Sequence, residues 1–296
     1  MNTNLPNAQA GQTVISTVEP VGSSGQLSFL QGRQLVWFSC GAASAVAAKL
    51  ALATHKGPEP LEVLYCELAN EHPDNERFRA DCEKWLGVPI KGLRSAEYPT
   101  MDIYDVFRKE QYVAGIGGAT CTKHLKREVR MAYEWREDTH IFGYTVDEGK
   151  RIATFESENP HLRTLFILRD LGVTKQDCYR IIEDAGIVLP MMYRLGFNNN
   201  NCINCVKGGA VYQNKCRIHF PEETAKMAAF TRAMGVKLVK YKGERIYLDE
   251  LPPDAGNYEF EGDIECGPQC NTSDFNSDFI GSVESLDRAG MKELKK

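Results

Sequence analysis

The chain lacks three features that would each define a class of protein: a long apolar run, an excess of basic residues and an internal repeat. Its apolar runs are too short to span a bilayer, so we expect no membrane association. It has 35 Lys and Arg against 40 Asp and Glu, a formal net charge of −5. This balance argues against a protein that coats nucleic acid by charge alone, although it leaves room for a local basic cleft.

The first residues also lack the basic start and apolar core of a cleavable signal sequence. We therefore expect a cytoplasmic protein, in which thiols stay reduced. Cysteine, by contrast, is abundant, with ten in 296 residues. Clustered cysteines in a reducing compartment more often bind a metal or carry out chemistry than form disulfides.

Apolar strands alternate with helical segments along most of the chain. The expected strands are residues 34–39, 61–68, 88–95 and 139–144, and the expected helices are 44–54, 74–86, 121–135, 174–185 and 221–234. A hairpin is expected to turn at Lys242 and Gly243. This alternation predicts an α/β fold, with a Rossmann-like parallel sheet that has helices on both faces.

Composition divides the chain into four parts. Residues 1–30 are rich in Asn, Gly, Ser, Thr and Gln without periodicity, which predicts a flexible N-terminal arm. Residues 31–200 are expected to form the α/β domain, and 201–271 a smaller cysteine-bearing C-terminal region. Residues 272–296 are polar and are expected to form a flexible tail.

A turn of small residues, Ser39-Cys40-Gly41-Ala42-Ala43-Ser44, joins the first expected strand to the first helix. The N–H groups and dipole of a helix N-terminus attract an anion, and Ser39 and Ser44 add hydroxyl donors. The pattern therefore predicts a phosphate-binding turn. The alternative is a tight turn that is made of small residues only to allow close packing.

Polar residues follow two other expected strands. Glu67 ends one strand, and Tyr144, Glu148 and Arg151 follow another. Ligands of open parallel sheets bind beyond the carboxyl ends of the strands. We therefore expect these residues and the small-residue turn to share one crevice.

Four segments, in this order, resemble the PP-loop superfamily and within it the phosphoadenosine phosphosulfate (PAPS) reductase family. They are "FSCGAASA" at 38–45, "LYCELANEHPDNERF" at 64–78, "CTKHLKREVR" at 121–130 and "FGYTVDEGKRIATF" at 142–155. The resemblance covers residues 34 to 270 and implies a fold like that of the adenine nucleotide alpha hydrolases. The turn departs from the family pattern at Cys40, where a glycine is usual, and at Ala42 and Ala43, where a polar pair is common.

The resemblance implies an adenine nucleotide, either ATP or PAPS, in the crevice. It implies that Ser39, Gly41 and Ser44 hold a phosphate, pyrophosphate or sulfate group, with Cys40 contributing its backbone N–H. The residues expected to complete the nucleotide site are Glu67, Lys123, Lys126, Tyr144, Glu148 and Arg151. Lys123, Lys126 and Arg151 would be anion partners, and Glu148 would orient Arg151 or bind a ribose. Exposed helix faces without a ligand are the alternative for the two lysines.

Two pairs of cysteines are closely spaced, Cys202 with Cys205 and Cys266 with Cys270. Such pairs are a common way to build a four-thiolate site for zinc or a [4Fe-4S] cluster. The resemblance gives an alternative set for an iron–sulfur site, Cys121, Cys202, Cys205 and Cys216. The remaining cysteines, Cys40, Cys66, Cys82 and Cys178, are expected to be small buried apolar residues.

The tail "ECGPQC" resembles the Glu-Cys-Gly-x-His tail of PAPS reductases, with Gln269 in place of the histidine. In that family the cysteine attacks sulfur and forms a thiosulfonate, which would make Cys266 the catalytic nucleophile. A cysteine bound to a structural metal would be a poor nucleophile, so the two roles of Cys266 exclude each other.

Two classes of function follow. The first is an enzyme of sulfur or adenylyl-transfer chemistry: a PAPS reductase-like oxidoreductase with a thioredoxin-like reductant or sulfur donor, or an ATP-dependent enzyme that thiolates or phosphorothioates a nucleic acid or nucleotide. The second is a nucleotide-binding module with structural zinc and no turnover. The net charge favours a small nucleotide over a polynucleotide, and homo-oligomer formation is left open.

Overall fold

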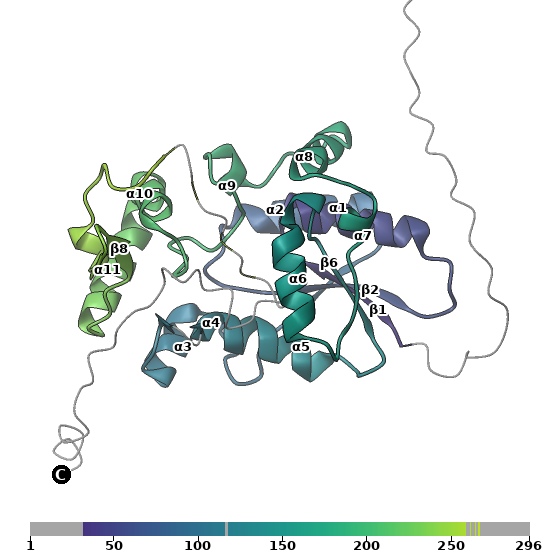
Figure 1. The fold of residues 1–296 in the computed structure, drawn as a ribbon, viewed down its shortest axis with the longest axis horizontal. Coiled ribbons are helices and arrows are strands. Elements are labelled where there is room, and N and C mark those ends of the chain that lie inside the picture. The colour runs from purple at the N-terminus through teal and green to yellow at the C-terminus, as the bar shows by residue number, and fades with distance from the viewer. Residues whose placement is uncertain (1–31, 116–117, 259–260, 262–263, 265, 267–296) are drawn as a thin grey trace, which may run out of the picture. The chain divides into compact units, whose positions relative to one another are not determined.

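The centre of the molecule is a sheet of five parallel strands in the order β3-β2-β1-β6-β7 (Figure 1). The strands are β1 (Gln34–Phe38), β2 (Leu61–Cys66), β3 (Ile90–Leu93), β6 (Thr139–Phe142) and β7 (Arg163–Leu165). The expected parallel sheet and its first four strands are confirmed. The sequence analysis missed β7, since three residues show too little alternation to indicate a strand.

The computed structural model describes residues 32–115, 118–258, 261, 264 and 266. Contacts divide the chain into two units, Met1–Gln31 and Gly32–Lys296, and all described residues belong to the second. The expected arm and tail lie outside the described residues.

Helices cover both faces of the sheet, as expected (Figure 1). The strand residues alternate between two cores: Val36 and Phe38 contribute to one, and Leu35 and Trp37 to the other. The first core includes residues of α1 (Ala42–Thr54), α2 (Asp74–Leu86), α7 (Ile167–Asp170) and α8 (Lys175–Asp184). The second includes residues of α3 (Ile103–Glu110), α5 (Glu128–Tyr133) and α6 (Gly149–Glu158).

The basic segment at 121–135 is not the single regular helix that its pattern predicts. It consists of α4 (Thr120–Thr122), a π-helical stretch at Lys123–Arg127 and α5. A π-helical stretch changes which side chains share a face, and such stretches are frequent at functional sites.

The part that follows the sheet contains α9 (Met191–Arg194), α10 (Ala210–His219) and α11 (Pro221–Ala233). A hairpin of β8 (Val239–Tyr241) and β9 (Glu244–Ile246) follows, and it turns at Lys242 and Gly243 as expected. Both turn residues have positive φ, 49° and 89°, which favours the glycine. In Figure 1, α10, α11 and β8 lie together at one end of the sheet.

The remaining elements are short. A second hairpin pairs β4 (Ala114–Gly115) with β5 (Gly118–Ala119). Two 3₁₀ turns span Val146–Glu148 and Leu248–Glu250.

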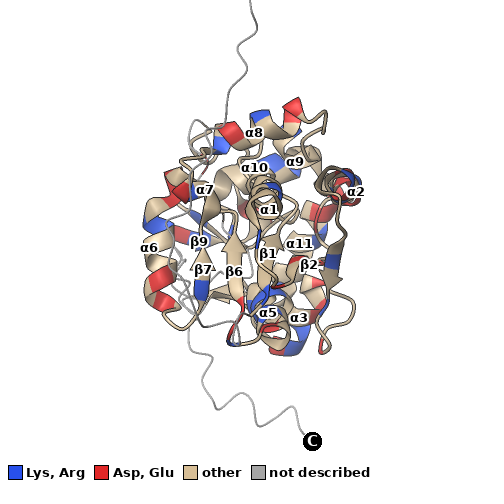
Figure 2. Cartoon of the chain, turned by 90° about the vertical axis from the view of Figure 1, so that its right-hand side faces the viewer, with Lys and Arg blue, Asp and Glu red and all other residues tan. Residues whose placement is uncertain are grey.

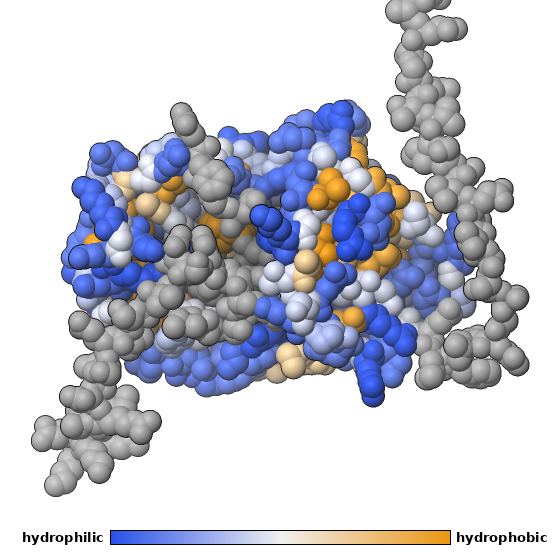
Figure 3. All heavy atoms as spheres, in the orientation of Figure 1, coloured by the Kyte–Doolittle hydropathy of each residue, from blue (hydrophilic) through white to orange (hydrophobic). Residues whose placement is uncertain are grey.

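The described surface is mixed in charge and polarity. On the side seen in Figure 2, basic and acidic residues are interspersed rather than separated by sign, and hydrophilic residues cover most of the face in Figure 3. None of the helices in the described ranges combines the length and apolar character that a bilayer crossing requires.

Acid is expected to destabilise the fold through His140, a buried residue of β6. Nδ1 of His140 accepts a hydrogen bond from the indole N–H of Trp37, at 3.0 Å between the two nitrogens. Nε2 of His140 lies 3.3 Å from a carboxylate oxygen of Glu134. Burial, assisted by the charge of Arg130, lowers the pKa of His140 from 6.5 to about 4. Because the unfolded chain then takes up this proton more readily, stability is fully present above pH 6.5 and is lost as pH falls toward 4.

The loss from His140 should approach about 3 kcal/mol, from about 1.4 kcal/mol for each pKa unit. Burial raises the pKa of Glu134, so the folded chain takes up this proton more readily than the unfolded chain does. Around its own titration, Glu134 therefore makes the fold more stable as pH falls, opposite to His140. Denaturant unfolding of wild type and His140→Gln across this pH range isolates the histidine. The variant should lose the part of the pH dependence between 6.5 and 4, and an identical profile would contradict this origin.

Candidate functional site

A cavity lies beyond the carboxyl ends of β1 and β6. Its walls include Ser39, Gly41 and Ser44 after β1, and Gly143 and Tyr144 after β6. Of the residues predicted from the sequence, eight line it: Ser39, Gly41, Ser44, Lys126, Tyr144, Glu148, Arg151 and Cys266. The structure therefore brings together groups from segments that are up to about 230 residues apart in the sequence.

The hydroxyl of Ser44 holds the small-residue turn in shape. It accepts hydrogen bonds from the Ser39 N–H at 3.0 Å and the Ser39 hydroxyl at 3.1 Å, and it donates to the Gly41 carbonyl at 2.9 Å. Gly41 is the N-cap of α1 and offers no side-chain acceptor to the first turn of the helix. The N-terminal N–H groups and dipole of α1 consequently point toward the cavity side of the turn.

Cys40 occupies the centre of this turn in a left-handed conformation, with φ of 55°. This conformation favours glycine, so the departure from the family pattern at this position carries a conformational cost of about 1 kcal/mol. The thiol is fully buried in the core between the sheet and α1, and burial raises its pKa well above the ordinary value. Cys40 therefore presents only its backbone to the cavity side.

Tyr193 of α9 covers the turn. The backbone N–H groups of Ala42 and Asn200 donate to its hydroxyl, and burial raises its pKa to about 12. A Cβ placed on Gly41 would lie 3.2 Å from the Tyr193 hydroxyl. An anion at the N-terminus of α1 would thus contact this hydroxyl or displace it. Sequence reasoning missed Tyr193, because nothing in its local pattern indicates contact with a turn 150 residues away.

Glu148 orients Arg151 on the rim of the cavity. One carboxylate oxygen of Glu148 accepts from the N–H and hydroxyl of Thr145, at 2.9 and 3.1 Å. The other oxygen pairs with the guanidinium of Arg151, which also lies over the Tyr144 ring. Of the two roles expected for Glu148, this is the one that the geometry favours.

Lys126 is a buried cation at the floor of the site. Its ammonium group lies 3.5 Å from the Glu71 carboxylate and donates to the Cys266 carbonyl at 2.7 Å. The Tyr65 hydroxyl and the Asn75 amide also donate to Glu71, at 2.5 and 2.9 Å. Burial disfavours the charged lysine, but the negative charges of Cys266 and Glu71 outweigh it and raise the pKa of Lys126.

Four thiols interact electrostatically with one another: those of Cys121, Cys202, Cys205 and Cys266. Burial raises the pKa of the Cys121 and Cys202 thiols, and a hydrogen bond with Cys266, together with burial, raises the pKa of the Cys205 thiol. A hydrogen bond from Cys205 lowers the pKa of Cys266 well below the ordinary value for a thiol, against the opposing effect of burial. Lys126, Lys207 and the Thr122 hydroxyl, 3.4 Å from the sulfur, lower it further. Of these four cysteines, Cys266 is the one whose thiol pKa is lowered.

This group contains three members of each predicted metal-ligand set: Cys202, Cys205 and Cys266 of the first, and Cys121, Cys202 and Cys205 of the alternative. Cys270, from the first set, lies outside the described residues. Cys216, from the alternative set, is buried inside α10, where its sulfur accepts the Asn204 N–H at 3.4 Å. The four cysteines expected to be apolar core residues, Cys40, Cys66, Cys82 and Cys178, are all buried.

Three residues predicted for the nucleotide site lie outside the lining of the cavity: Cys40, described above, Glu67 and Lys123. Glu67 pairs with Arg79 at 3.6 Å and Arg94 at 3.2 Å. Lys123 is half exposed and lies 3.8 Å from Glu128. The exposed-helix alternative therefore describes Lys123, whereas Lys126, three residues later, is buried in the site.

The cavity also contains polar residues that sequence reasoning did not select. They are Thr145, Lys175, Asn199, Asn200 and Asn201. Asn200 is buried and its amide donates to the carbonyl of Cys40 and to Asn75, each at 2.8 Å. The run of four asparagines before Cys202 was the available signal, because buried amides often fix a loop around a ligand.

No protein-family model matches this chain, and no curated protein matches it significantly. The function is therefore inferred from the side chains that line the cavity.

Proposed function

We propose that this protein is a PP-loop enzyme that binds an adenine nucleotide in the cavity and carries out sulfur chemistry at Cys266, in the manner of a PAPS reductase. The observation that supports this most is the lining of the cavity itself. It combines a hydroxyl-bearing turn at a helix N-terminus, three basic side chains (Lys126, Arg151 and Lys175) and a thiol of lowered pKa. Phosphate or sulfate recognition and a nucleophile thus meet in one space.

In this proposal the turn Ser39–Ser44 holds a phosphate or sulfate group. The dipole of α1 and the serine hydroxyls favour a negative charge there. Arg151, fixed by Glu148, supplies a forked donor suited to phosphate oxygens. Ala42 and Ala43 provide no charged group beside the turn, so the proposal assigns anion binding mainly to backbone groups, Arg151 and Lys126.

The reaction begins with attack of the Cys266 thiolate on the sulfur of a sulfonucleotide. The bond between sulfur and the phosphate oxygen breaks, and its electron pair leaves with the nucleotide. Cys266 then carries a thiosulfonate. A dithiol reductant of the thioredoxin type attacks the Cys266 sulfur and releases sulfite, and its second thiol resolves the mixed disulfide. The two electrons come from the dithiol.

By ligand type the thiols of Cys121, Cys202 and Cys205 would suit a metal centre, since they are buried and interact with Cys266. Among the described residues, however, these sulfur atoms do not form a group of three within 4.8 Å of one another, so a single bound ion would require them to move closer. Soft thiolate ligands suit zinc or an iron–sulfur cluster. These three cysteines would hold the group, with Cys270 as the candidate fourth ligand, because Cys266 is the nucleophile in this proposal and cannot be a metal ligand as well. A cluster would supply electrostatic tuning of the nearby cavity, and zinc would supply structural support.

Metal content distinguishes these cases. Anaerobically purified protein is expected to contain about four irons per chain and to absorb broadly in the visible range, as a cysteine-ligated cubane cluster does. Elemental analysis of wild type and Cys202→Ser measures this. One zinc without colour would instead make the cysteines structural and would favour nucleotide binding without reductive chemistry.

The direct test of the reaction uses reduced full-length protein mixed with PAPS in the absence of a reductant. Intact mass should increase by one SO₃ group, and peptide mapping should place it on Cys266. Cys266→Ser should lose the adduct but keep nucleotide affinity, and adenosine 3′,5′-bisphosphate should give no adduct. Absence of the adduct together with pyrophosphate release from ATP would replace this proposal with the ATP-dependent alternative.

A further inference from the structure

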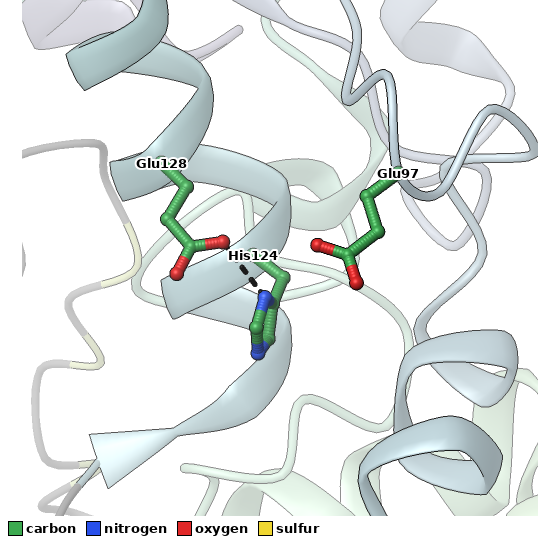
Figure 4. A group of neighbouring side chains, drawn as sticks. All are labelled: Glu97, His124 and Glu128. Atoms are coloured by element: carbon green, nitrogen blue, oxygen red, sulfur yellow. Dashed lines mark hydrogen bonds and ion pairs between the residues drawn. The ribbon is translucent and has the colours of Figure 1, made fainter.

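A second group of ligating side chains lies on the basic segment, apart from the residues that line the cavity. Its members are His124 of the π-helical stretch, Glu128 at the start of α5, and Glu97 in the loop between β3 and α3. One potential ligand atom from each lies within 4.8 Å of the other two. Figure 4 shows the carboxylates of Glu97 and Glu128 near the imidazole, on either side of it.

The hydrogen bonding around His124 leaves one ring nitrogen with an unused lone pair. Nδ1 lies 2.8 Å from an oxygen of Glu128. Because a carboxylate can only accept, Nδ1 must donate there, and in the neutral imidazole the proton is then on Nδ1. Nε2 is left as an acceptor, and the side chain is only 7% exposed.

That nitrogen faces another acceptor. Nε2 of His124 lies 3.4 Å from a carboxylate oxygen of Glu110 and has no hydrogen-bond partner. Tyr98 donates to the other oxygen of Glu110 at 2.6 Å and so fixes this carboxylate in place. Two acceptors that face each other in a buried position are unfavourable unless a proton or a cation lies between or beside them.

Three carboxylates surround this single imidazole. The cations beside them are Lys109, 2.6 Å from Glu97, and Lys123, 3.8 Å from Glu128. Both lysine side chains are about half exposed, so they can turn to solvent at little cost. The cluster then has the negative charge and the number of ligand atoms that a divalent cation needs.

We propose that Glu97, Glu128 and Nδ1 of His124 form a binding site for a divalent transition-metal ion. The ion takes the place of the proton on Nδ1, and in the bound imidazole the proton is on Nε2, which then donates to Glu110. One imidazole with carboxylates is a donor set for Mn²⁺, Fe²⁺, Co²⁺ or Zn²⁺, and it differs from the thiol group in ligand softness. Such an ion would join the π-helical stretch to the loop before α3. It would thereby brace the segment that carries Lys126 and Cys121.

The test uses Mn²⁺, which prefers oxygen and nitrogen ligands to thiolates. Reduced full-length protein without nucleotide is titrated with Mn²⁺, and the electron paramagnetic resonance signal of the unbound ion is followed. About one Mn²⁺ should bind per chain. Loss of a ligand in Glu97→Gln or Glu128→Gln should weaken binding about tenfold or more. Both side chains are partly exposed, so neither change should disturb folding.

The matched control is Asp105→Asn, which removes a similarly exposed carboxylate from α3 and should leave Mn²⁺ binding unchanged. The proposal is overturned if the wild type binds no Mn²⁺, or if Glu97→Gln and Glu128→Gln bind it as tightly as Asp105→Asn does. A proton rather than a metal would then satisfy His124. Because the titration contains no nucleotide, its outcome is independent of the proposed enzymatic function.

Discussion

Replacing Gly143 with valine is expected to destabilise the protein by about 3 kcal/mol and to abolish anion binding in the cavity. A Cβ at Gly143 would lie 2.7 Å from both N and Cα of Ser44, and 2.9 Å from the carbonyl carbon of Ala43. These are backbone atoms in the first turn of α1, so they cannot move aside as a flexible side chain would. The loop after β6 would have to separate from the turn that we assign to phosphate.

Gly149 provides the matched control in the same rim segment. It begins α6, and a Cβ there would meet nothing within 4 Å. Gly149→Ala should therefore be neutral or more stable, by up to about 1 kcal/mol. Denaturant unfolding and nucleotide titration of both variants measure the difference. Equal stability and affinity of Gly143→Val and Gly149→Ala would show that the close approach of β6 and α1 does not shape the site.

Replacing Lys126 with methionine should cost about 3–5 kcal/mol, the usual range for removing one partner of a buried ion pair. Glu71, 9% exposed, would keep its neutral donors, Tyr65 and Asn75, but lose the cation beside it. The same change should raise the pKa of Cys266, because the Lys126 ammonium is one of the groups that lower it.

Lys123→Met is the comparison, since Lys123 lies three residues earlier and is about half exposed. Removal of an exposed ion pair should change stability by no more than about 0.5 kcal/mol. The free energy of unfolding and the pH dependence of iodoacetamide labelling at Cys266 report the two effects. If both lysine variants behave alike, Lys126 is not the buried cation of the site.

The sheet, most of its helices and part of the cavity could be predicted because local signals indicate them. The apolar run of β1, the alanine-rich α1 and the small residues between them are each recognised from neighbouring residues in the sequence. The C-x-x-C pair and the polar residues after β6 are local signals as well. The carboxyl ends of parallel strands meet at one edge, so these separate segments could be assigned to one crevice.

The other features of the candidate site depend on tertiary contacts. Lys126 is buried and Lys123 is exposed, whereas the sequence left both lysines as either anion partners or exposed helix residues. Glu67 follows β2 directly, yet two arginines hold it away from the cavity lining. Tyr193 reaches the site from a distant part of the chain. Contacts of this kind have no local sequence signal.

The most direct test of the central claim is calorimetric titration of the reduced protein with PAPS and with ATP, in wild type and in Arg151→Ala. The account predicts saturable binding of at least one of these nucleotides at one site per chain. Loss of the charged, forked donor of Arg151 should weaken it about tenfold or more. If the wild type binds neither nucleotide, or if Arg151→Ala binds as tightly as the wild type, the cavity is not the nucleotide site proposed here.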